Sequence, residues 1–338
     1  MCRKQFKLII SSSMPPFITV LTPAYNKGDT IGRTFKSLLN QTCFDFEWLV
    51  INDGSADNTD DIVKGFKTEK FPIRYVSKKN EGLGRTFNEG VRLSKGKLIF
   101  RLDPDDYLSP NAIEQVVKYR SLLNDDNICA LVFLAKFDTG EVVGYHPYKE
   151  EFHRSDFLKY RLFDKATGDR AEVVKTKVLK EFPWPTFENE KFCLETLLWH
   201  PIAHKYDAFY INEATYIREY NQNSITAAGS KTYITNPIGT MAVTSYLVKE
   251  LIEYGGFRKF GYAILKNAIN YWRYGLNAGA YRMCKSFKLP TSLNIIAFLP
   301  GWFLYKIDKK NPAKINKIMK RVKQFRNKDN FSNLTIKE

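Results

Sequence analysis

Short apolar runs alternate with segments of helical period from residue 17 to about residue 134 of this chain. Each run has the length of a strand, and the segments between the runs place apolar residues three and four positions apart. Strands that alternate with helices in this way build a mostly parallel sheet that is covered by helices on both faces. The sequence therefore predicts an α/β fold, with strands at 17–21, 46–51, 73–76, 97–102 and 128–135.

The helices between these strands have recognisable ends. Asp29 is the expected N-cap of the first helix, and Ser109 and Pro110 supply a cap and a first-turn proline for a later one. The third helix is predicted at 83–93. Beyond residue 137 we expect a helix from about Glu190, short strands at 209–211 and 214–217, and a helical region from about residue 237.

Positive charge is concentrated in the C-terminal third of the chain. The net charge is +16, and residues 231–338 contain 20 Lys and Arg against 5 Asp and Glu. We expect an α/β domain at 15–229 and a basic, mainly helical domain at 230–338. A basic domain suits the phosphates of nucleic acid or of membrane lipid. A solvated helix surface explains the same charge without any partner.

The chain is not expected to span a membrane, because no stretch approaches about 18 uninterrupted apolar residues. The apolar segment 293–305 contains Pro300 and Gly301, so we expect it to be buried or to lie at an interface. The five cysteines are scattered and form no C-x-x-C pair. This pattern indicates neither a zinc knuckle nor a disulfide framework, and it favours reduced thiols in a cytosolic protein.

Polar residues follow three of the predicted strands directly. Their carboxyl ends meet at one edge of a parallel sheet, where ligands of such folds bind. An aromatic ring there can stack on a base, and clustered carboxylates suit a hard divalent cation that holds a diphosphate. The pattern predicts a site for a nucleoside diphosphate derivative and a metal, built from Thr22, Pro23, Tyr25, Asn26, Asn52, Asp53, Asp103, Asp105 and Asp106.

Each of these groups alone has an ordinary structural explanation. The segment from Asn52 to Ser55 is a good turn sequence. The aspartates at 103, 105 and 106 suit a solvated turn and a helix cap, although they repel one another unless a cation compensates. Arg85 is within possible reach of a diphosphate, and a surface position suits it equally. The functional interpretation therefore depends on the three groups occurring together.

Three segments of the chain resemble the family 2 glycosyltransferases of the GT-A fold. The first is FITVLTPAYNKGDTIGRTFKSLLNQTCFDFEWLVINDGSADNTDDIV, and the second, RLDPDDYLSPNAIE, resembles the D-x-D-D region of the family. The third, GDRAEVVKTKVLKEFPWPTFENEKF, extends the resemblance to about residue 226, nearly two-thirds of the chain. The resemblance implies that Thr22, Pro23, Tyr25 and Asp53 hold the base, that Asp103 lies near the ribose, and that Asp105 ligates Mg²⁺ or Mn²⁺.

The family inverts the configuration at the anomeric carbon by direct displacement, which requires one general base for the acceptor hydroxyl. By resemblance this base is Glu190. Asn189 separates Glu188 from Glu190 where the family often has an acidic pair, so Glu188 is an alternative base. A third possibility is that Glu190 only places charge at a helix N-terminus. Asp169, Arg170 and Trp184 lie where the family contacts its acceptor.

We therefore expect transfer of a sugar from a nucleotide-sugar, with a UDP-sugar favoured, to a hydroxyl of a glycan or lipid-linked saccharide. The family's bacterial members build capsule, exopolysaccharide or cell-wall polymers. Such an enzyme would be cytoplasmic, peripheral at the inner face of the cell membrane, and without a nucleic-acid partner. Two other functions remain open. One is a basic nucleic-acid-binding protein, and the other is a sugar-phosphate nucleotidyltransferase.

Overall fold

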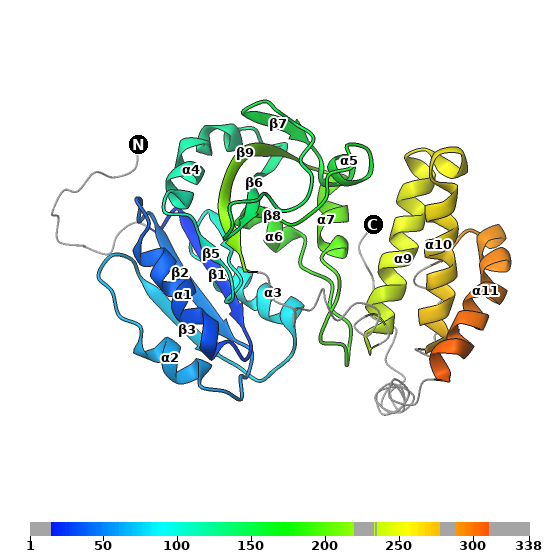
Figure 1. Cartoon of the computed structure of the whole chain (residues 1–338), viewed down its shortest axis with the longest axis horizontal. Helices are drawn as coiled ribbons and strands as arrows, with labels where there is room; N and C mark the ends of the chain where they lie inside the picture. Colours follow the sequence, from blue (N-terminus) through cyan, green and yellow to red (C-terminus); the bar gives the residue numbers. More distant parts are fainter. Residues whose placement is uncertain (1–14, 220–232, 234, 278–287, 311–338) are drawn as a thin grey trace. The chain divides into compact units, whose positions relative to one another are not determined.

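Residues 15–219, 233, 235–277 and 288–310 are described by a computed structural model of the chain. The chain forms two compact units, shown in Figure 1. Unit 1 comprises Met1–Trp184 and Leu198–Asn221, and unit 2 comprises Pro185–Leu197 and Gln222–Glu338. Unit 2 thus groups the C-terminal region with a segment that precedes it by some 25 residues. The predicted domain boundary at 229/230 remains a prediction.

The centre of unit 1 is one sheet. Its strands within the described residues are β1 (Ile18–Ala24), β2 (Phe46–Asn52), β3 (Ile73–Ser77), β4 (Leu98–Arg101), β5 (Tyr107–Leu108), β6 (Ile128–Phe137), β7 (Phe152–Ser155), β8 (Arg170–Lys175) and β9 (Asp207–Arg218). Their order is β3-β2-β1-β4-β8-β6-β9-β5, with β7 paired to β9. All five predicted strands are confirmed to within three residues at either end. The two short strands expected at 209–217 are one continuous strand, β9.

The sheet is parallel where the sequence alternates most regularly. β1 pairs in parallel with β2 and with β4, and β2 pairs in parallel with β3. The residues of β1 and β2 are all buried, as expected for strands covered on both faces. Beyond β4 the sheet is mixed, because β8 pairs antiparallel with both β4 and β6. The predicted α/β class is confirmed.

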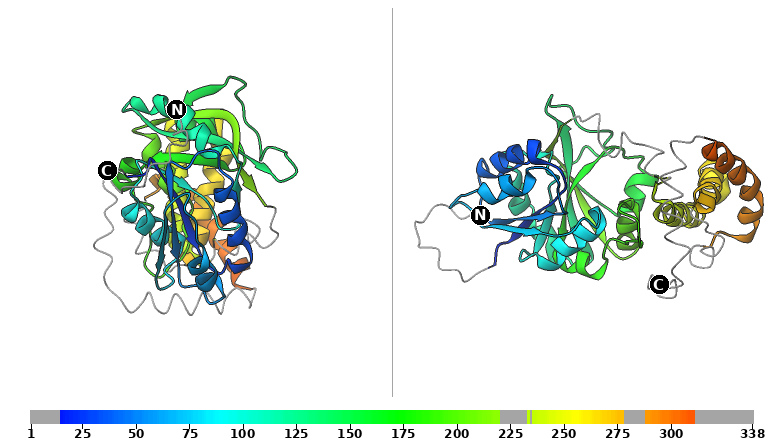
Figure 2. Two further views of the ribbon diagram at one scale, coloured as in Figure 1. Left: turned by 90° about the vertical axis from the view of Figure 1, so that its left-hand side faces the viewer. Right: turned by 90° about the horizontal axis from the view of Figure 1, so that it is seen from below.

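Helices cover both faces of this sheet, as Figure 2 shows. α1 packs beside α2, and α3 packs beside α6 and against β1 and β2. Asp29 is not the cap of α1, because the helix begins at Gly28 and Lys27 holds the N-cap position. The helices described between residues 15 and 203 are α1 (Gly28–Leu39), α2 (Thr59–Gly65), α3 (Leu83–Leu93), α4 (Ala112–Lys118), α5 (Phe157–Leu162), α6 (Thr176–Glu181) and α7 (Thr196–Ala203), with a 3-10 turn at Arg120–Asn124.

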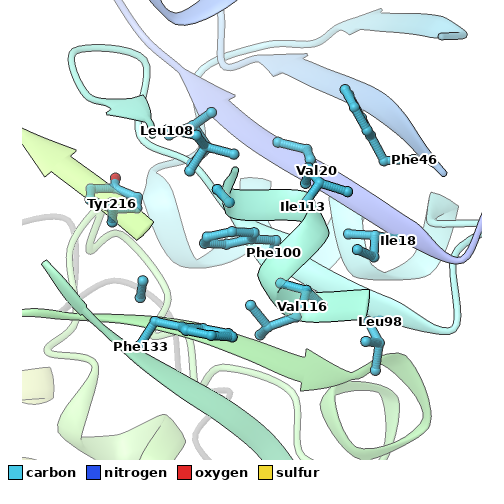
Figure 3. Packing of buried hydrophobic residues seen from close by; sticks show 14 of the residues in the cluster. Ile18, Val20, Phe46, Leu98, Phe100, Leu108, Ile113, Val116, Phe133 and Tyr216 are labelled. Atoms are coloured by element: carbon cyan, nitrogen blue, oxygen red, sulfur yellow. The ribbon is translucent and has the colours of Figure 1, made fainter. Parts of the chain in front are cut away.

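The main core of unit 1 lies between the sheet and the helices α1 and α4. Ile113 and Val116 of α4 face Phe100 of β4 and Phe133 of β6, as Figure 3 shows. Tyr216 of β9 belongs to the same core, with its ring centroid 6.5 Å from that of Phe100. The packing fixes the carboxyl ends of β1, β2 and β4 relative to one another, which is what a site at this edge requires.

Unit 2 is helical in its described C-terminal part, as predicted. It contains α9 (Pro237–Glu253), α10 (Gly256–Asn277) and α11 (Thr291–Lys309), and α10 packs against both of the others. The helix expected from Glu190 is absent, because α7 begins only at Thr196. None of the described helices is long and apolar enough to cross a membrane.

The cysteines differ in state. Cys129 and Cys193 carry free thiols, whereas Cys43 is disulfide-bonded. The expectation that all cysteines are reduced is therefore wrong at Cys43. Nothing in the local pattern around this residue indicated a bond, because the cysteines are widely separated along the chain.

Candidate active site

The end of β1 supplies one exposed ring and several buried groups. Tyr25 follows the strand and is 49% exposed, so its face is open to a ligand. Thr22 is fully buried, and its hydroxyl accepts a hydrogen bond of 2.9 Å from the indole N–H of Trp48. Pro23 is also buried within the strand. Of the predicted base contacts at this strand, Tyr25 is therefore the one whose side chain faces solvent.

Asn26 connects the ends of β1 and β2. It has a positive φ of 51°, a conformation that asparagine tolerates better than most residues. Its backbone N–H donates to the hydroxyl of Ser55 at 2.9 Å, and its side-chain oxygen accepts from the N–H of Ala56 at 2.8 Å. Asn26 thus joins the two loops that carry Tyr25 and Asp53.

Asp53 follows β2 and organises the loop before α3. Its two carboxylate oxygens accept hydrogen bonds of 2.8 Å each from the backbone N–H groups of Glu81 and Gly82. The ammonium of Lys78 lies 3.6 Å from the same carboxylate. Arg85, in the first turn of α3, donates to the carbonyl of Glu81 at 3.2 Å. The predicted nucleotide-binding residues Asp53 and Arg85 are therefore brought together through one short loop.

The loop after β4 holds the acidic cluster, and α1 fixes its backbone. Thr30 donates to the carbonyl of Pro104 at 2.8 Å, and Thr34 donates to the carbonyl of Asp106 at 2.9 Å. Asp103 accepts two bonds from the guanidinium of Arg101, at 2.8 and 2.9 Å. The bonds from α1 thus fix the backbone of this loop. The orientation of each carboxylate depends on the side chain that pairs with it.

Asp105 pairs with the ammonium of Lys27, which lies at the start of α1. The carboxylate side chain of Asp105 is 25% exposed, so it remains accessible to a ligand. Lys27 was not predicted as a site residue. Its position directly after Tyr25 and Asn26 was a usable signal, because it places a cation at the same strand end as the acidic loop.

Asp106 is the buried member of the cluster. It accepts hydrogen bonds from the Tyr216 hydroxyl at 2.9 Å and from the backbone N–H of Glu219 at 3.2 Å. Burial, together with the charges of Asp103 and Asp105, raises the pKa of Asp106 to about 7. The Tyr216 hydroxyl also accepts a bond of 3.0 Å from the Asp103 N–H. The contacts that hold this loop to β9 come from residues more than 100 positions away, which sequence reasoning missed.

The acidic loop fits a divalent cation by the chemistry of its donors. Carboxylate oxygens are hard ligands, and Mg²⁺ commonly takes one or two of them and completes its shell with substrate phosphates and water. Within the described residues there is no group of three or more His, Cys, Asp or Glu side chains that could hold a metal by itself. A cation at Asp105 would therefore need the diphosphate as a further ligand.

Glu190 belongs to unit 2 and binds the start of α9. Its two carboxylate oxygens accept hydrogen bonds from the backbone N–H groups of Ile238 and Gly239, at 2.6 and 2.8 Å. Such N–H groups in a first helical turn lack partners within their own helix, so the carboxylate acts as a cap. Glu190 is 4% exposed, whereas Glu188 is exposed. Its predicted role as general base remains a prediction.

The residues expected near the acceptor have structural contacts within unit 1. Arg170 is buried and donates to the carbonyls of Val143 and Tyr145, at 2.8 and 2.7 Å. Trp184 is 1% exposed and packs edge-on against Phe87, with ring centroids 5.6 Å apart. These contacts position loops and fill the core.

The sequence model of Glycosyl transferase family 2 matches residues 19–174, which include all three strand ends described above. Chondroitin synthase of Pasteurella multocida (strain Pm70) is 40% identical over 103 residues, which are 30% of this chain. The aligned part of this chain spans only 11% of that synthase.

Two further proteins are similar over most of the chain. The GalNAc(5)-diNAcBac-PP-undecaprenol beta-1,3-glucosyltransferase of Campylobacter jejuni is 25% identical over 311 residues, which cover 87% of this chain and 97% of the relative. A crystal structure of S. aureus TarS 1-349 in complex with UDP-GlcNAc has a TM-score of 0.55, with 15% identity over 87% of this chain and 91% of TarS. At that identity the similarity to TarS concerns the fold alone.

Proposed function

This chain belongs to glycosyl transferase family 2, and from that premise we propose that it transfers a sugar from a UDP-sugar to a hydroxyl of a glycan or lipid-linked saccharide. In the proposed reaction the acceptor oxygen attacks the anomeric carbon and gives its proton to a general base, for which we propose Glu190. The bond to the UDP oxygen breaks, UDP leaves with the bonding electrons, and the configuration inverts. The family assignment does not favour the nucleic-acid-binding or nucleotidyltransferase alternatives.

The observation that carries this proposal is the meeting of three strand ends around one acidic loop. Tyr25 offers an open ring face for the base, Asp53 follows β2, and Arg85 lies at the start of α3 beside the loop that Asp53 holds. Asp103 and Asp105 follow β4, and α1 holds their loop against the end of β1. We assign Asp103 to the ribose and Asp105 to Mg²⁺ or Mn²⁺, which would offset the diphosphate charge when bound.

Lys27 adds to this assignment. Its ammonium pairs with Asp105 and so supplies positive charge at the position proposed for the diphosphate. An ammonium is a compact point charge that commonly binds phosphate groups. We therefore include Lys27 among the residues proposed to contact the donor.

The acceptor is proposed from the relatives. The name of the Campylobacter jejuni relative describes an acceptor linked to undecaprenol through a diphosphate. An acceptor of that kind is anchored in a membrane, and the basic C-terminal region of this chain would favour an anionic leaflet. We propose that the enzyme works peripherally at the cytoplasmic face of the cell membrane.

Binding of the donor nucleotide is the first test. We expect UDP, in the presence of Mg²⁺ or Mn²⁺, to raise the unfolding midpoint of the full chain more than GDP does. A ligand at about 100 times its Kd stabilises the folded state by about 2.7 kcal/mol, which is readily measured by thermal melting. If no nucleoside diphosphate shifts the midpoint with either metal, the proposed site is wrong.

A further inference from the structure

α11 carries most of its large apolar side chains on the outside. Their exposed fractions range from 37% to 73%. A helix on a water-facing surface normally directs polar residues outward and buries its apolar stripe. The outward residues of α11 are Ile295, Ile296, Phe298, Leu299, Trp302, Phe303 and Ile307.

The orientation of α11 is fixed by its other face. Leu293, Ala297 and Gly301 are buried and four residues apart, so they form one stripe along the helix. A Cβ atom added at Gly301 would lie 2.5 Å from the Cβ of Trp272 on α10, which shows how closely the two helices approach. Figure 1 shows α11 beside α10. Rotating the helix to bury its large apolar residues would lose this close packing.

An ion pair holds the end of the helix in the same orientation. Arg273 of α10 donates two hydrogen bonds to Asp308, at 2.7 and 2.8 Å. Asp308 is the only acidic residue of α11, and it is buried. The outward face therefore carries no negative charge, and its last turn presents Lys306 and Lys309, followed by Lys310. No described segment covers the outward apolar side chains of α11, since each of them is at least 37% exposed.

We propose that α11 docks the protein onto an anionic lipid bilayer, with its outward apolar side chains inserted among the lipids and its lysines on the headgroup phosphates. The inference deepens the membrane association included in the proposed function and rests on it. It assigns that association to one helix, which lies in the interface and does not cross it.

Charge favours a bilayer over a second copy of the chain as the occupant. Residues 306–338 contain 11 Lys and Arg against 3 Asp and Glu. Two copies that met through α11 would bring Lys306, Lys309 and Lys310 of each copy together, and like charges repel. An anionic leaflet instead attracts them, by about 1 kcal/mol for each basic residue near the surface.

Vesicle co-sedimentation of the full chain tests this inference. We expect binding to phosphatidylcholine vesicles that contain phosphatidylglycerol. The double variant Leu299→Ser/Phe303→Ser should lower this partitioning by at least about tenfold, because two apolar side chains no longer leave water. Replacing Lys306, Lys309 and Lys310 by Gln should weaken binding to the anionic vesicles by about fivefold for each lysine.

Matched controls separate docking from a loss of folding. Phe257→Ser and Tyr262→Ser remove exposed aromatic rings from α10, and both variants should bind vesicles as the unaltered chain does. Trp302→Phe should keep binding but lose much of the blue shift in fluorescence that the lipid induces. UDP stabilisation should be unchanged in every variant, so a failure of docking is distinguishable from a failure of the donor site.

Three results would overturn the inference. The first is an unaltered chain that does not bind anionic vesicles. The second is a Leu299→Ser/Phe303→Ser variant that is folded and still binds them equally well. The third is a dimer, measured by light scattering, that this variant converts to a monomer without any change in vesicle binding, since a second copy would then occupy the face.

Discussion

Replacing Asp105 by asparagine is expected to lower the rate of sugar transfer by about 10³-fold and to leave the fold intact. Asparagine keeps the size of the side chain but removes the charge that would hold a divalent cation. A cation that polarises the leaving diphosphate contributes several kcal/mol, and about 4 kcal/mol corresponds to three decades in rate. Because the Asp105 side chain is 25% exposed and its ion pair with Lys27 is partly solvated, the substitution should cost little stability. Steady-state transfer rates and a thermal melt measure the two effects.

Asp138→Asn is the matched control for Asp105→Asn. Asp138 is exposed in the turn after β6, so the same chemical change there should alter neither rate nor melting. Excess EDTA should reproduce the effect of Asp105→Asn on the unaltered enzyme. Full activity of the Asp105 variant, or undiminished activity in EDTA, would refute the metal assignment.

The second large effect is expected from Glu190→Gln, which should lower turnover by roughly 10²-fold if Glu190 is the general base. The same variant should also lose about 1–3 kcal/mol of stability, for a separate reason. Glutamine has an NH₂ donor in place of one carboxylate oxygen, and this donor would face the backbone N–H of Ile238 or Gly239. That buried N–H group would then have lost its acceptor. Turnover of the folded fraction and the unfolding midpoint must therefore be measured together.

Glu188→Gln is the control for this variant, since Glu188 is two residues away and exposed. We expect it to melt as the unaltered chain does and to turn over more than Glu190→Gln. If Glu190→Gln is less stable but its folded fraction has normal turnover, Glu190 is only the cap of α9. If Glu188→Gln is the inactive variant and Glu190→Gln is active, the general base is Glu188.

The parallel half of the sheet was predictable because its signals are local. Each strand from β1 to β4 is a short apolar run beside a helix with apolar residues three and four apart, so no distant contact decides its structure. Tyr25, Asp53 and Asp105 could be predicted at strand ends for the same reason, because each follows a strand that the local pattern defines. The antiparallel insertion of β8 between β4 and β6 has no such local signal, since it depends on pairing over some 75 residues.

The contacts of the candidate site were harder to predict for the same reason. Asp106 is held by Tyr216 over 110 residues, and Asp105 is paired with Lys27 over 78. The helix expected from Glu190 is wrong because the segment from Phe187 turns there, with Asn189 at a φ of 62° and the N–H of Glu190 bonded to the Phe187 carbonyl. The acidic residues at 188 and 190 are thus weak evidence for a helix that starts there, because Glu190 caps α9, which lies later in the chain.

The central claim is that the strand ends of unit 1 bind a nucleotide-sugar and activate its sugar for transfer. Release of nucleoside diphosphate from a panel of nucleotide-sugars, with Mn²⁺ and a polyprenyl-diphosphate-linked saccharide, measures this directly. The account predicts metal-dependent release from a UDP-sugar, in step with elongation of the acceptor and lost in Asp105→Asn. Release by the unaltered chain that persists at the same rate in Asp105→Asn, or a folded chain that releases nothing from any of the nucleotide-sugars, would contradict it.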